Sequence, residues 1–149
     1  MARSPAPVAK LDVPQAAEVR PDEFAALARF RSTLRQFLAF SEQAAAGNGM
    51  TMQWYQALLV IKTNGGEAPI SVGELAEQLL IKDHSAAELV SRLVDAKLVR
   101  RKTDTQDRRR SLILITPLGE RRLTKLAAAH LSRLRDDRGA FLGLFDSTP

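Results

Sequence analysis

Residues 71–116 decide the fold, and they read Ser-Val-Gly-Glu-Leu-Ala-Glu-Gln-Leu-Leu-Ile-Lys-Asp-His-Ser-Ala-Ala-Glu-Leu-Val-Ser-Arg-Leu-Val-Asp-Ala-Lys-Leu-Val-Arg-Arg-Lys-Thr-Asp-Thr-Gln-Asp-Arg-Arg-Arg-Ser-Leu-Ile-Leu-Ile-Thr. Ser71 and Glu74 form the Ser-x-x-Glu pattern of a capping box, in which each side chain accepts a hydrogen bond from the backbone N–H of the other residue. The pattern therefore predicts a helix over residues 72–79.

A second helix follows after a very short connection. Residues 80–82 leave room only for a turn, and apolar residues then recur at helical spacing over residues 83–96. We expect Leu89, Val90 and Leu93 to lie in the core. Two short helices with such a connection form a helix-turn-helix, and its second helix is shaped for the major groove of DNA.

The sequence period changes from helix to strand after residue 97. Residues 98–103 and 111–116 favour strands, and a polar tip that contains residues 104–107 separates them. This pattern predicts a β-hairpin, the wing, and Pro69-Ile70 allows one more very short strand. The expected fold class is mainly α with a small β-hairpin, a winged helix-turn-helix.

Amphipathic helices flank the winged unit on both sides. Residues 21–46 carry apolar side chains at steps of three and four, and a second helix is expected over residues 52–62. Thr116-Pro117 caps and starts another long helix. The apolar residues Phe141, Leu142, Leu144 and Phe145 finish the chain.

The expected organisation is a flexible N-terminal arm over residues 1–20 and a single domain over residues 21–149, of which about 51–116 form the winged helix-turn-helix. In a chain of 149 residues the apolar faces of the segments 21–46 and 117–146 cannot all be covered internally. We therefore expect these segments to be dimerisation helices that pair across a two-fold axis. For the arm, a disordered tail is favoured over a basic arm with Arg3 and Lys10 that reaches DNA.

Composition narrows the possible functions. Lys and Arg number 22 against 17 Asp and Glu, a net charge of +5 that favours nucleic acid over a membrane surface as the partner. Cysteine is absent from the sequence, and the two histidines, His84 and His130, are far apart, so we expect no metal and no cofactor. There is no apolar run of roughly 20 residues and no signal-peptide pattern, so we expect a cytoplasmic protein without a membrane partner.

Catalytic patterns are also missing from the sequence. It contains no phosphate loop, no nucleophile elbow and no histidines at metal-ligand spacing. We therefore expect that the chain is not an enzyme.

Several fragments together resemble the multiple-antibiotic-resistance-regulator (MarR) family. They are Leu34-Arg-Gln-Phe-Leu, Met50-Thr-Met-Gln-Trp, Gly73-Glu-Leu-Ala-Glu-Gln-Leu, His84-Ser-Ala-Ala-Glu-Leu-Val-Ser-Arg-Leu-Val, Leu98-Val-Arg-Arg, Asp104-Thr-Gln-Asp-Arg-Arg-Arg and Leu114-Ile-Thr-Pro-Leu-Gly. The resemblance covers roughly residues 24 to 135 and is most specific in the wing. It implies a transcription regulator, typically a repressor, that dimerises through its terminal helices. With two recognition helices in successive major grooves, the operator would be a pseudo-palindrome with half-sites roughly 10 bp apart.

The chain departs from the family pattern at four positions. Gln106 stands where relatives often have Arg, and Leu80 and Lys97 stand where they commonly have Gly. If position 97 has a positive φ, Lys there costs of order 1 kcal/mol. Lys82 replaces a capping Ser and cannot accept from backbone N–H groups, so we expect Asp83 to take over the cap.

The predicted wing and its approach concentrate positive charge. Arginine suits phosphate by its planar fork, and it suits a narrow minor groove because it is less strongly hydrated than lysine. Asp107 is expected to orient Arg109 or its neighbour rather than to touch DNA. The alternative is a solvated hairpin whose charges serve solubility. Two acids, Asp104 and Asp107, face the cations Lys97, Arg100, Arg101, Lys102, Arg108, Arg109 and Arg110, of which we expect Arg101, Arg108, Arg109 and Arg110 to bind DNA.

The resemblance implies that the helix over residues 83–96 reads bases. Ser85 can bond to several bases, and the methyl group of Ala86 can touch a thymine methyl group. Glu88 accepts from cytosine or is solvated or paired with arginine, and Arg92 holds either a phosphate or a carboxylate. For His84 three interpretations stay open: a DNA contact, a ligand contact, or an ordinary polar contact.

The resemblance also implies a cleft for a small aromatic or phenolic effector between the terminal helices and the winged unit. Binding there would change the spacing of the recognition helices and release DNA. An aromatic stripe at helical spacing is more often plain core, and His130 is expected in the core or at a dimer interface. The candidate lining residues are Phe37, Phe40, Ser41, Trp54, Tyr55 and His84.

The function that these features favour is sequence-specific binding of double-stranded DNA by a homodimeric repressor. The rival is a winged-helix module that binds another protein and has no sequence preference on DNA. A steep dependence of duplex binding on salt would separate the two, because released counterions accompany phosphate contacts.

Overall fold

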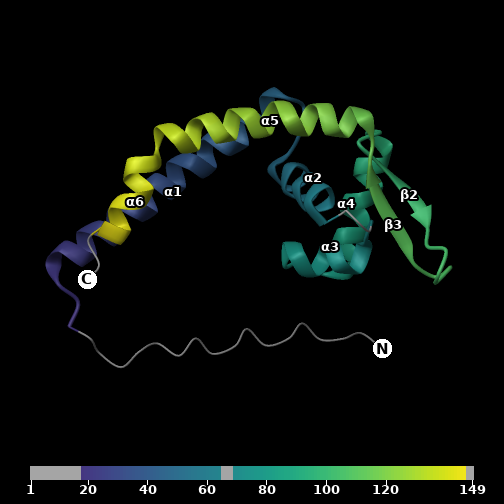
Figure 1. Ribbon diagram of the computed structural model, residues 1–149, viewed down its shortest axis with the longest axis horizontal. Coiled ribbons are helices and arrows are strands. Elements are labelled where there is room, and N and C mark those ends of the chain that lie inside the picture. Colours follow the sequence, from purple (N-terminus) through teal and green to yellow (C-terminus); the bar gives the residue numbers. More distant parts are fainter. Residues whose placement is uncertain (1–17, 65–68, 147–149) are drawn as a thin grey trace.

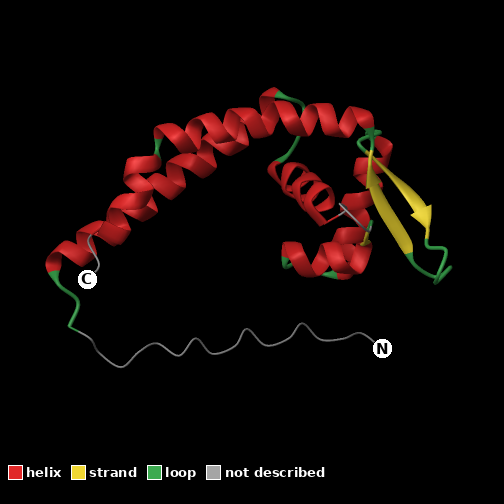
Figure 2. Cartoon of the chain, viewed as in Figure 1, coloured by secondary structure: helices red, strands yellow, loops and turns green. Residues whose placement is uncertain are grey.

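The computed structural model describes residues 18–64 and 69–146, and most of them are helical (Figures 1 and 2). Every helix and strand predicted between residues 21 and 116 is present, with bounds that agree within two residues, and the predicted segment 117–146 is divided into two helices. Residues 1–17 of the predicted arm lie outside the described residues. The elements in order are α1 (Pro21–Gly47), α2 (Met52–Asn64), β1 (Ile70–Ser71), α3 (Val72–Leu79), α4 (Asp83–Asp95), β2 (Val99–Thr103), β3 (Ser111–Ile115), α5 (Pro117–Asp136) and α6 (Arg138–Asp146).

The helices fall into two groups. Figure 1 shows α1, α5 and α6 along a long arch, with α2, α3 and α4 gathered under one end of it and the β2–β3 hairpin projecting beside them. We call α2 to β3 the winged unit and α1, α5 and α6 the long helices. The first half of α5 also packs on the winged unit, where Leu123 and Leu126 join its core. The fold is a winged helix-turn-helix, as predicted.

Local signals in the sequence set the starts of α3 and α5. The Glu74 N–H donates to Ser71 Oγ at 3.3 Å, and the Ser71 N–H donates to Glu74 Oε2 at 2.7 Å, which confirms the capping box. At α5, Thr116 Oγ accepts from the Gly119 N–H at 3.0 Å and donates to the Lys97 carbonyl at 2.7 Å. A Cβ at Gly119 would lie 2.1 Å from the Leu98 carbonyl oxygen, so only glycine permits this approach.

The sheet is small and antiparallel, with strand order β1-β3-β2. β1 pairs Ile70 with Ile113, and β2 pairs Arg101 with the same residue from the other side. Ile113 is buried, so the face of the sheet that carries it packs on the helices. The wing is therefore fixed to the core at the middle of β3 as well as at its root.

The core lies in the winged unit and under the first half of α5. Full burial of one such aliphatic side chain contributes about 1.5–3 kcal/mol relative to exposure. Leu89, Val90 and Leu93 belong to this core, as predicted. The largest fully buried apolar side chains are Leu58, Leu75, Leu93, Leu98, Ile113, Leu126 and Val90.

The long helices leave apolar side chains uncovered. None of the helices in the described ranges is long and apolar enough to cross a membrane. The apolar side chains of the long helices lie along one side of each helix, and the same helices also carry many charges. The exposed members on these helices are Phe24, Leu27, Leu38, Leu131, Leu134 and Leu142.

Candidate nucleic-acid interface

The turn between α3 and α4 has a left-handed residue. Leu80 lies at φ 54° and ψ 39°, and the next N–H, of Ile81, donates to the Ala76 carbonyl at 3.0 Å. Lys97, just before β2, also has a positive φ of 59°. The backbone therefore adopts at both positions a conformation that glycine takes without a steric cost, while this chain carries larger side chains there.

The first turn of α4 has no side-chain cap. Lys82 is the N-cap residue and makes no capping hydrogen bond. Asp83 lies inside the first turn, where its charge favours the positive end of the helix dipole. Our expectation that Asp83 caps the helix is therefore wrong, because it sits one position beyond the residue whose side chain can reach the free N–H groups.

Ala86 is the one predicted base contact that the structure contradicts. It is 0 % exposed, so its methyl group cannot meet a thymine methyl group. The reason is helical spacing: Ala86, Leu89, Val90 and Leu93 stand at i, i+3, i+4 and i+7, which is one buried stripe. The sequence already contained this signal.

The other predicted contacts on α4 are accessible. His84 and Glu88 are exposed, Ser85 is half-buried, and Arg92 is exposed one turn further on. Together they form a polar surface over the first turns of α4, on the side that the core stripe leaves open. An α-helix with such a surface fits the major groove.

The two faces of the wing sheet differ in what their cations meet. Arg100 pairs with Leu114 and Lys102 with Leu112, so these cations lie on the face away from Ile113. Arg101 shares the inner face with Ile113, and its Nη2 donates to Ser91 Oγ of α4 at 3.0 Å. Arg101, a predicted DNA contact, is thus held against the C-terminal half of α4.

The wing tip is organised by its two aspartates. Asp104 Oδ1 accepts from the Gln106 N–H at 2.9 Å, and Asp107 Oδ1 accepts from the Arg109 N–H at 3.0 Å. Arg109 Nε lies 3.5 Å from the same Asp107 oxygen, which confirms that Asp107 orients Arg109. The Arg109 side chain is nevertheless 93 % exposed, and Arg108 is exposed beside it. Two guanidinium groups are therefore presented at the tip.

Arg110 has a partner that the sequence analysis missed. Its Nη2 lies 3.2 Å from Glu74 Oε1, so the residue that completes the α3 capping box also holds the wing. The hydrogen bonds from the Ser71 backbone and side chain, with Arg110 nearby, lower the pKa of Glu74 below its ordinary value. Glu74 stays charged near neutral pH and fixes the wing to the helix-turn-helix. The spacing of Glu74 and Arg110 along the chain gave no hint of this contact.

Four of the six predicted effector residues form a packed cluster around His130. The ring of His130 stacks on Tyr55 at 4.4 Å and meets Phe37 and Phe40 edge-on at 5.8 and 5.7 Å. Its Nδ1 lies 2.8 Å from the Leu126 carbonyl, which can only accept, so Nδ1 donates. In the neutral ring Nε2 then accepts from the Ser41 hydroxyl. His130 is a core histidine, one of the two alternatives that the sequence left open.

In the protomer the predicted cleft is closed at two of these residues. Ser41 is 1 % exposed and Tyr55 is also buried, so neither lines an open cleft in the protomer. Trp54 is half-buried against the core, and His84 is exposed on α4. Side chains 89 residues apart in sequence, Ser41 and His130, fill the space with each other, which the helical spacing of the aromatic residues alone could not show.

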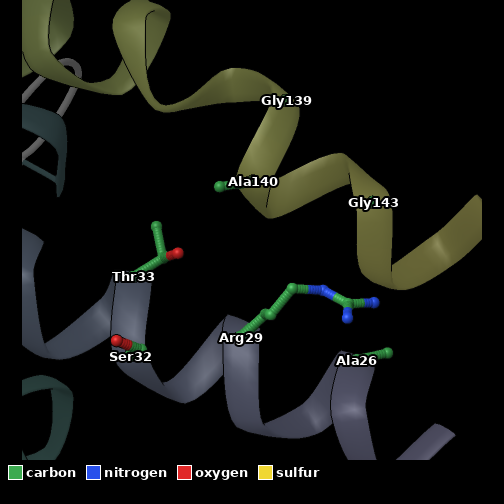
Figure 3. A pocket seen from close by; sticks show the side chains of 7 residues that line it. All are labelled: Ala26, Arg29, Ser32, Thr33, Gly139, Ala140 and Gly143. Carbon is green, nitrogen blue, oxygen red and sulfur yellow. The ribbon is translucent and has the colours of Figure 1, made fainter. Parts of the chain in front are cut away.

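A groove does lie between α1 and α6, and Figure 3 shows it from close by. Thr33 points toward Ala140 across it, and Arg29 extends along α1 beneath α6. Its volume is about 360 Å³, and none of the predicted effector residues lines it. Within the described ranges, no three His, Asp or Glu side chains gather closely enough to hold a metal ion. The lining residues are Ala26, Arg29, Ser32, Thr33, Gly139, Ala140 and Gly143.

Comparison with known proteins gives matches at the level of sequence and of fold. Residues 48–110 match the sequence profile of the MarR family. A Thauera aromatica protein, described as a proposed transcriptional regulatory protein for the hcr operon, is 30% identical over 122 residues, which cover 76% of this chain and 72% of that protein. The sequence match therefore extends beyond the winged unit into the long helices.

Solved structures agree with this match. AbsC, a MarR family transcriptional regulator from Streptomyces coelicolor, superposes with a TM-score of 0.67 at 22% identity, over 87% of this chain and 84% of that one. A mutant of MepR from Staphylococcus aureus, bound to an oligodeoxyribonucleotide, has a TM-score of 0.66 at 18% identity, over 76% of this chain and 80% of that one. Both likenesses include long helices as well as the winged helix-turn-helix, since they span three quarters of the chain or more.

Proposed function

The chain belongs to the MarR family of transcription regulators, and on this premise we propose that it is a homodimeric repressor that binds a pseudo-palindromic operator in duplex DNA. The observation that carries the proposal is the presence of two elements suited to DNA on one rigid unit. They are the polar surface at the start of α4 and the exposed guanidinium groups of Arg108 and Arg109 at the wing tip. The proposal includes no enzymatic role, and its place of action is the cytoplasm, with the chromosome.

Each element has a distinct task in this proposal. The first turns of α4 enter the major groove, where His84, Ser85 and Glu88 face base edges and Arg92 faces a phosphate. Arg108 and Arg109 approach the minor groove and its flanking phosphates. Because Arg101 and Arg110 are engaged by Ser91 and Glu74, we assign them to holding the wing rather than to DNA.

The exposed apolar side chains of the long helices support the dimer. Leu27 on α1, Leu134 on α5 and Leu142 on α6 are between 38 and 48 % exposed. These side chains lie on helices that contact one another, and apolar surface left open on neighbouring helices supports a surface that another chain covers. In a symmetric pair both copies would use the same surface patch for the interface. The two α4 helices would then face one side of the DNA.

An aromatic or phenolic effector is the last part of the proposal. It would have to enter by separating Phe37, Phe40 and Tyr55 from His130, because these rings pack together in the protomer. This cluster joins α1, α2 and α5, so its opening would move the winged unit relative to the long helices. A coupling of about 1–3 kcal/mol is enough to release an operator.

Selection of binding sites from a random pool of duplex DNA tests the proposal. We expect a two-fold-symmetric sequence, bound with an affinity that falls steeply as salt rises. Arg109→Ala should weaken binding and lower the slope of log affinity against log salt by about one per wing. Lys125→Ala, which removes an equal charge from the exposed side of α5, should leave both quantities unchanged. A pool without an enriched sequence would favour a winged helix that binds protein.

A further inference from the structure

Leu80 combines two features that oppose folding. Its φ of 54° lies in the left-handed region, where a side chain with a Cβ crowds the following carbonyl group. Its side chain is also 93 % exposed, the highest value among the large apolar residues that the structure describes. Glycine at this position would remove the strain and the exposed apolar surface together. Neither feature is therefore explained by stability.

The backbone around Leu80 is fixed, so the exposure of its side chain is imposed by the fold. The Leu80 N–H donates to the Glu77 carbonyl at 3.3 Å, and Ile81 N–H donates to the Ala76 carbonyl at 3.0 Å. Leu79 and Ile81, on either side, are partly buried against the core. Leu80 is held outward between two anchored neighbours.

The position of the turn indicates what this side chain meets. In a helix-turn-helix the first helix crosses the DNA backbone, and the second enters the major groove with its N-terminal residues first. The turn that joins them faces the rim of the groove. Leu80 lies three residues before Asp83, the first residue of α4, and the exposed Lys82 stands between them.

The surroundings of Leu80 favour DNA over a protein partner. A protein interface buries about 800 Å² on each side around an apolar centre. The exposed neighbours of Leu80 along the sequence are Glu77, Gln78, Lys82 and Asp83, and no other large apolar residue of the described winged unit is exposed. One apolar side chain beside a cation matches the size of a contact with a single thymine methyl group at the edge of a groove.

We infer that Leu80 is a DNA contact, whose side chain packs on apolar carbon at the rim of each half-site, either a thymine methyl group or deoxyribose. The inference rests on the proposed function. Leu80 adds affinity that the arginines of the wing do not supply, and this affinity does not depend on salt, because no ion is released by an apolar contact. Where the carbon is a methyl group, Leu80 also adds sequence preference.

The test pairs folding stability with DNA affinity in the full-length variant Leu80→Gly. We expect the unfolding midpoint to rise while affinity for the selected duplex falls by about fivefold per half-site, or about 25-fold for a dimer on two. The salt slope should stay that of the original chain. Leu80→Met, which keeps an apolar side chain, should retain the affinity, whereas Leu80→Asn, which tolerates the left-handed conformation but is polar, should lose it.

Replacement of thymine by uracil in the selected duplex separates the two sources of apolar carbon. If Leu80 packs on a methyl group, uracil weakens binding by the original chain and leaves Leu80→Gly unaffected. If it packs on deoxyribose, uracil changes neither, and Leu80→Gly still binds less tightly.

Equal affinity of Leu80→Gly and the original chain for the selected duplex would overturn the inference while the proposed repressor stands. A chain that enriches no duplex would overturn both.

Discussion

Core leucines of the winged unit and the outward-facing leucines of the long helices are in opposite environments. Leu58, Leu75 and Leu93 are completely buried, whereas Leu27, Leu131 and Leu142 are 44–52 % exposed. The winged unit therefore completes its own core within one chain, while the long helices do not. The proposed DNA-binding part is therefore packed within a single chain, whereas its spacing from the proposed second copy would depend on the surface that the long helices leave open.

A charge on the open surface should have the largest effect. We expect Leu27→Glu to convert the dimer to a monomer, because a carboxylate would be buried without a partner. Loss of the second half-site should weaken operator binding by about 10²-fold or more. Light scattering gives the mass, and a titration with duplex DNA gives the affinity.

Gln36→Glu is the matched control for this change. Position 36 is exposed, and nine residues of helix place it on the side of α1 opposite to Leu27. It adds the same charge and should leave the dimer intact. A dimer that survives Leu27→Glu would show that the open leucines are not its interface.

Leu93→Ala addresses the other side of the comparison. Leu93 is fully buried, and we expect the free energy of unfolding to fall by about 2–5 kcal/mol. When the winged unit unfolds in urea, this loss in free energy should not depend on the protein concentration. Leu131→Ala should instead destabilise only the associated form, and its effect should vanish on dilution. Equal losses for both variants at every concentration would remove the distinction between the two regions.

The contact between α1 and α5 within the long helices can be weakened at Ser41. Ser41→Ala removes the hydroxyl that bonds to His130 Nε2 and leaves a buried ring nitrogen without a partner. We expect the free energy of unfolding to fall by about 1–3 kcal/mol. Ser132→Ala, on the exposed side of α5, is the control and should be neutral. Thermal unfolding measures both variants, and equal melting temperatures would mean that the Ser41–His130 bond does not stabilise the packing of α1 on α5.

The smallest effect is expected within the winged unit, at Glu74. Its pKa is lowered in the folded chain, so its contribution to stability is complete above its ordinary value of 4.5 and is lost as pH falls through the lowered value. Glu74→Gln keeps an acceptor for the capping box but has no charge for Arg110. Both side chains are about half exposed, so the loss at neutral pH should stay below about 1 kcal/mol.

Urea unfolding at neutral pH and below pH 4.5 measures this effect. The difference between Glu74→Gln and the original chain should shrink as the pH falls. An unchanged difference would mean that the Glu74 charge does not hold the wing.

The elements were predictable because their boundaries are local. Ser71 with Glu74, and Thr116 with Pro117, specify helix starts within a few residues of sequence, and the structure has both. The Asp107–Arg109 contact is local in the same way. Contacts between distant segments were not predictable: Glu74 meets Arg110, and Ser41 meets His130, only because the folded chain brings them together.

The wrong prediction for Ala86 could have been avoided from the sequence near it. Ala86 was taken for a base contact by its place at the start of α4, although its spacing to Leu89, Val90 and Leu93 predicts burial. The spacing of apolar residues along a helix is therefore a better guide to which side chains are exposed than the type of residue at each position. The residues predicted at the effector cleft show the same point, since aromatic residues at helical spacing pack together when a facing helix supplies a partner such as His130.

Because Gly119 has no side chain, α5 packs directly on the backbone at Leu98. The N-terminal end of α5 is therefore attached to the root of the wing. The 20 residues of α5 span about 30 Å at 1.5 Å per residue. If α5 pivots by about 5° about its C-terminal end, the wing root moves by about 2–3 Å. The rise between neighbouring base pairs is about 3.4 Å. In the proposed complex with DNA, a small tilt of α5 would therefore shift the wing by a distance close to one base-pair rise.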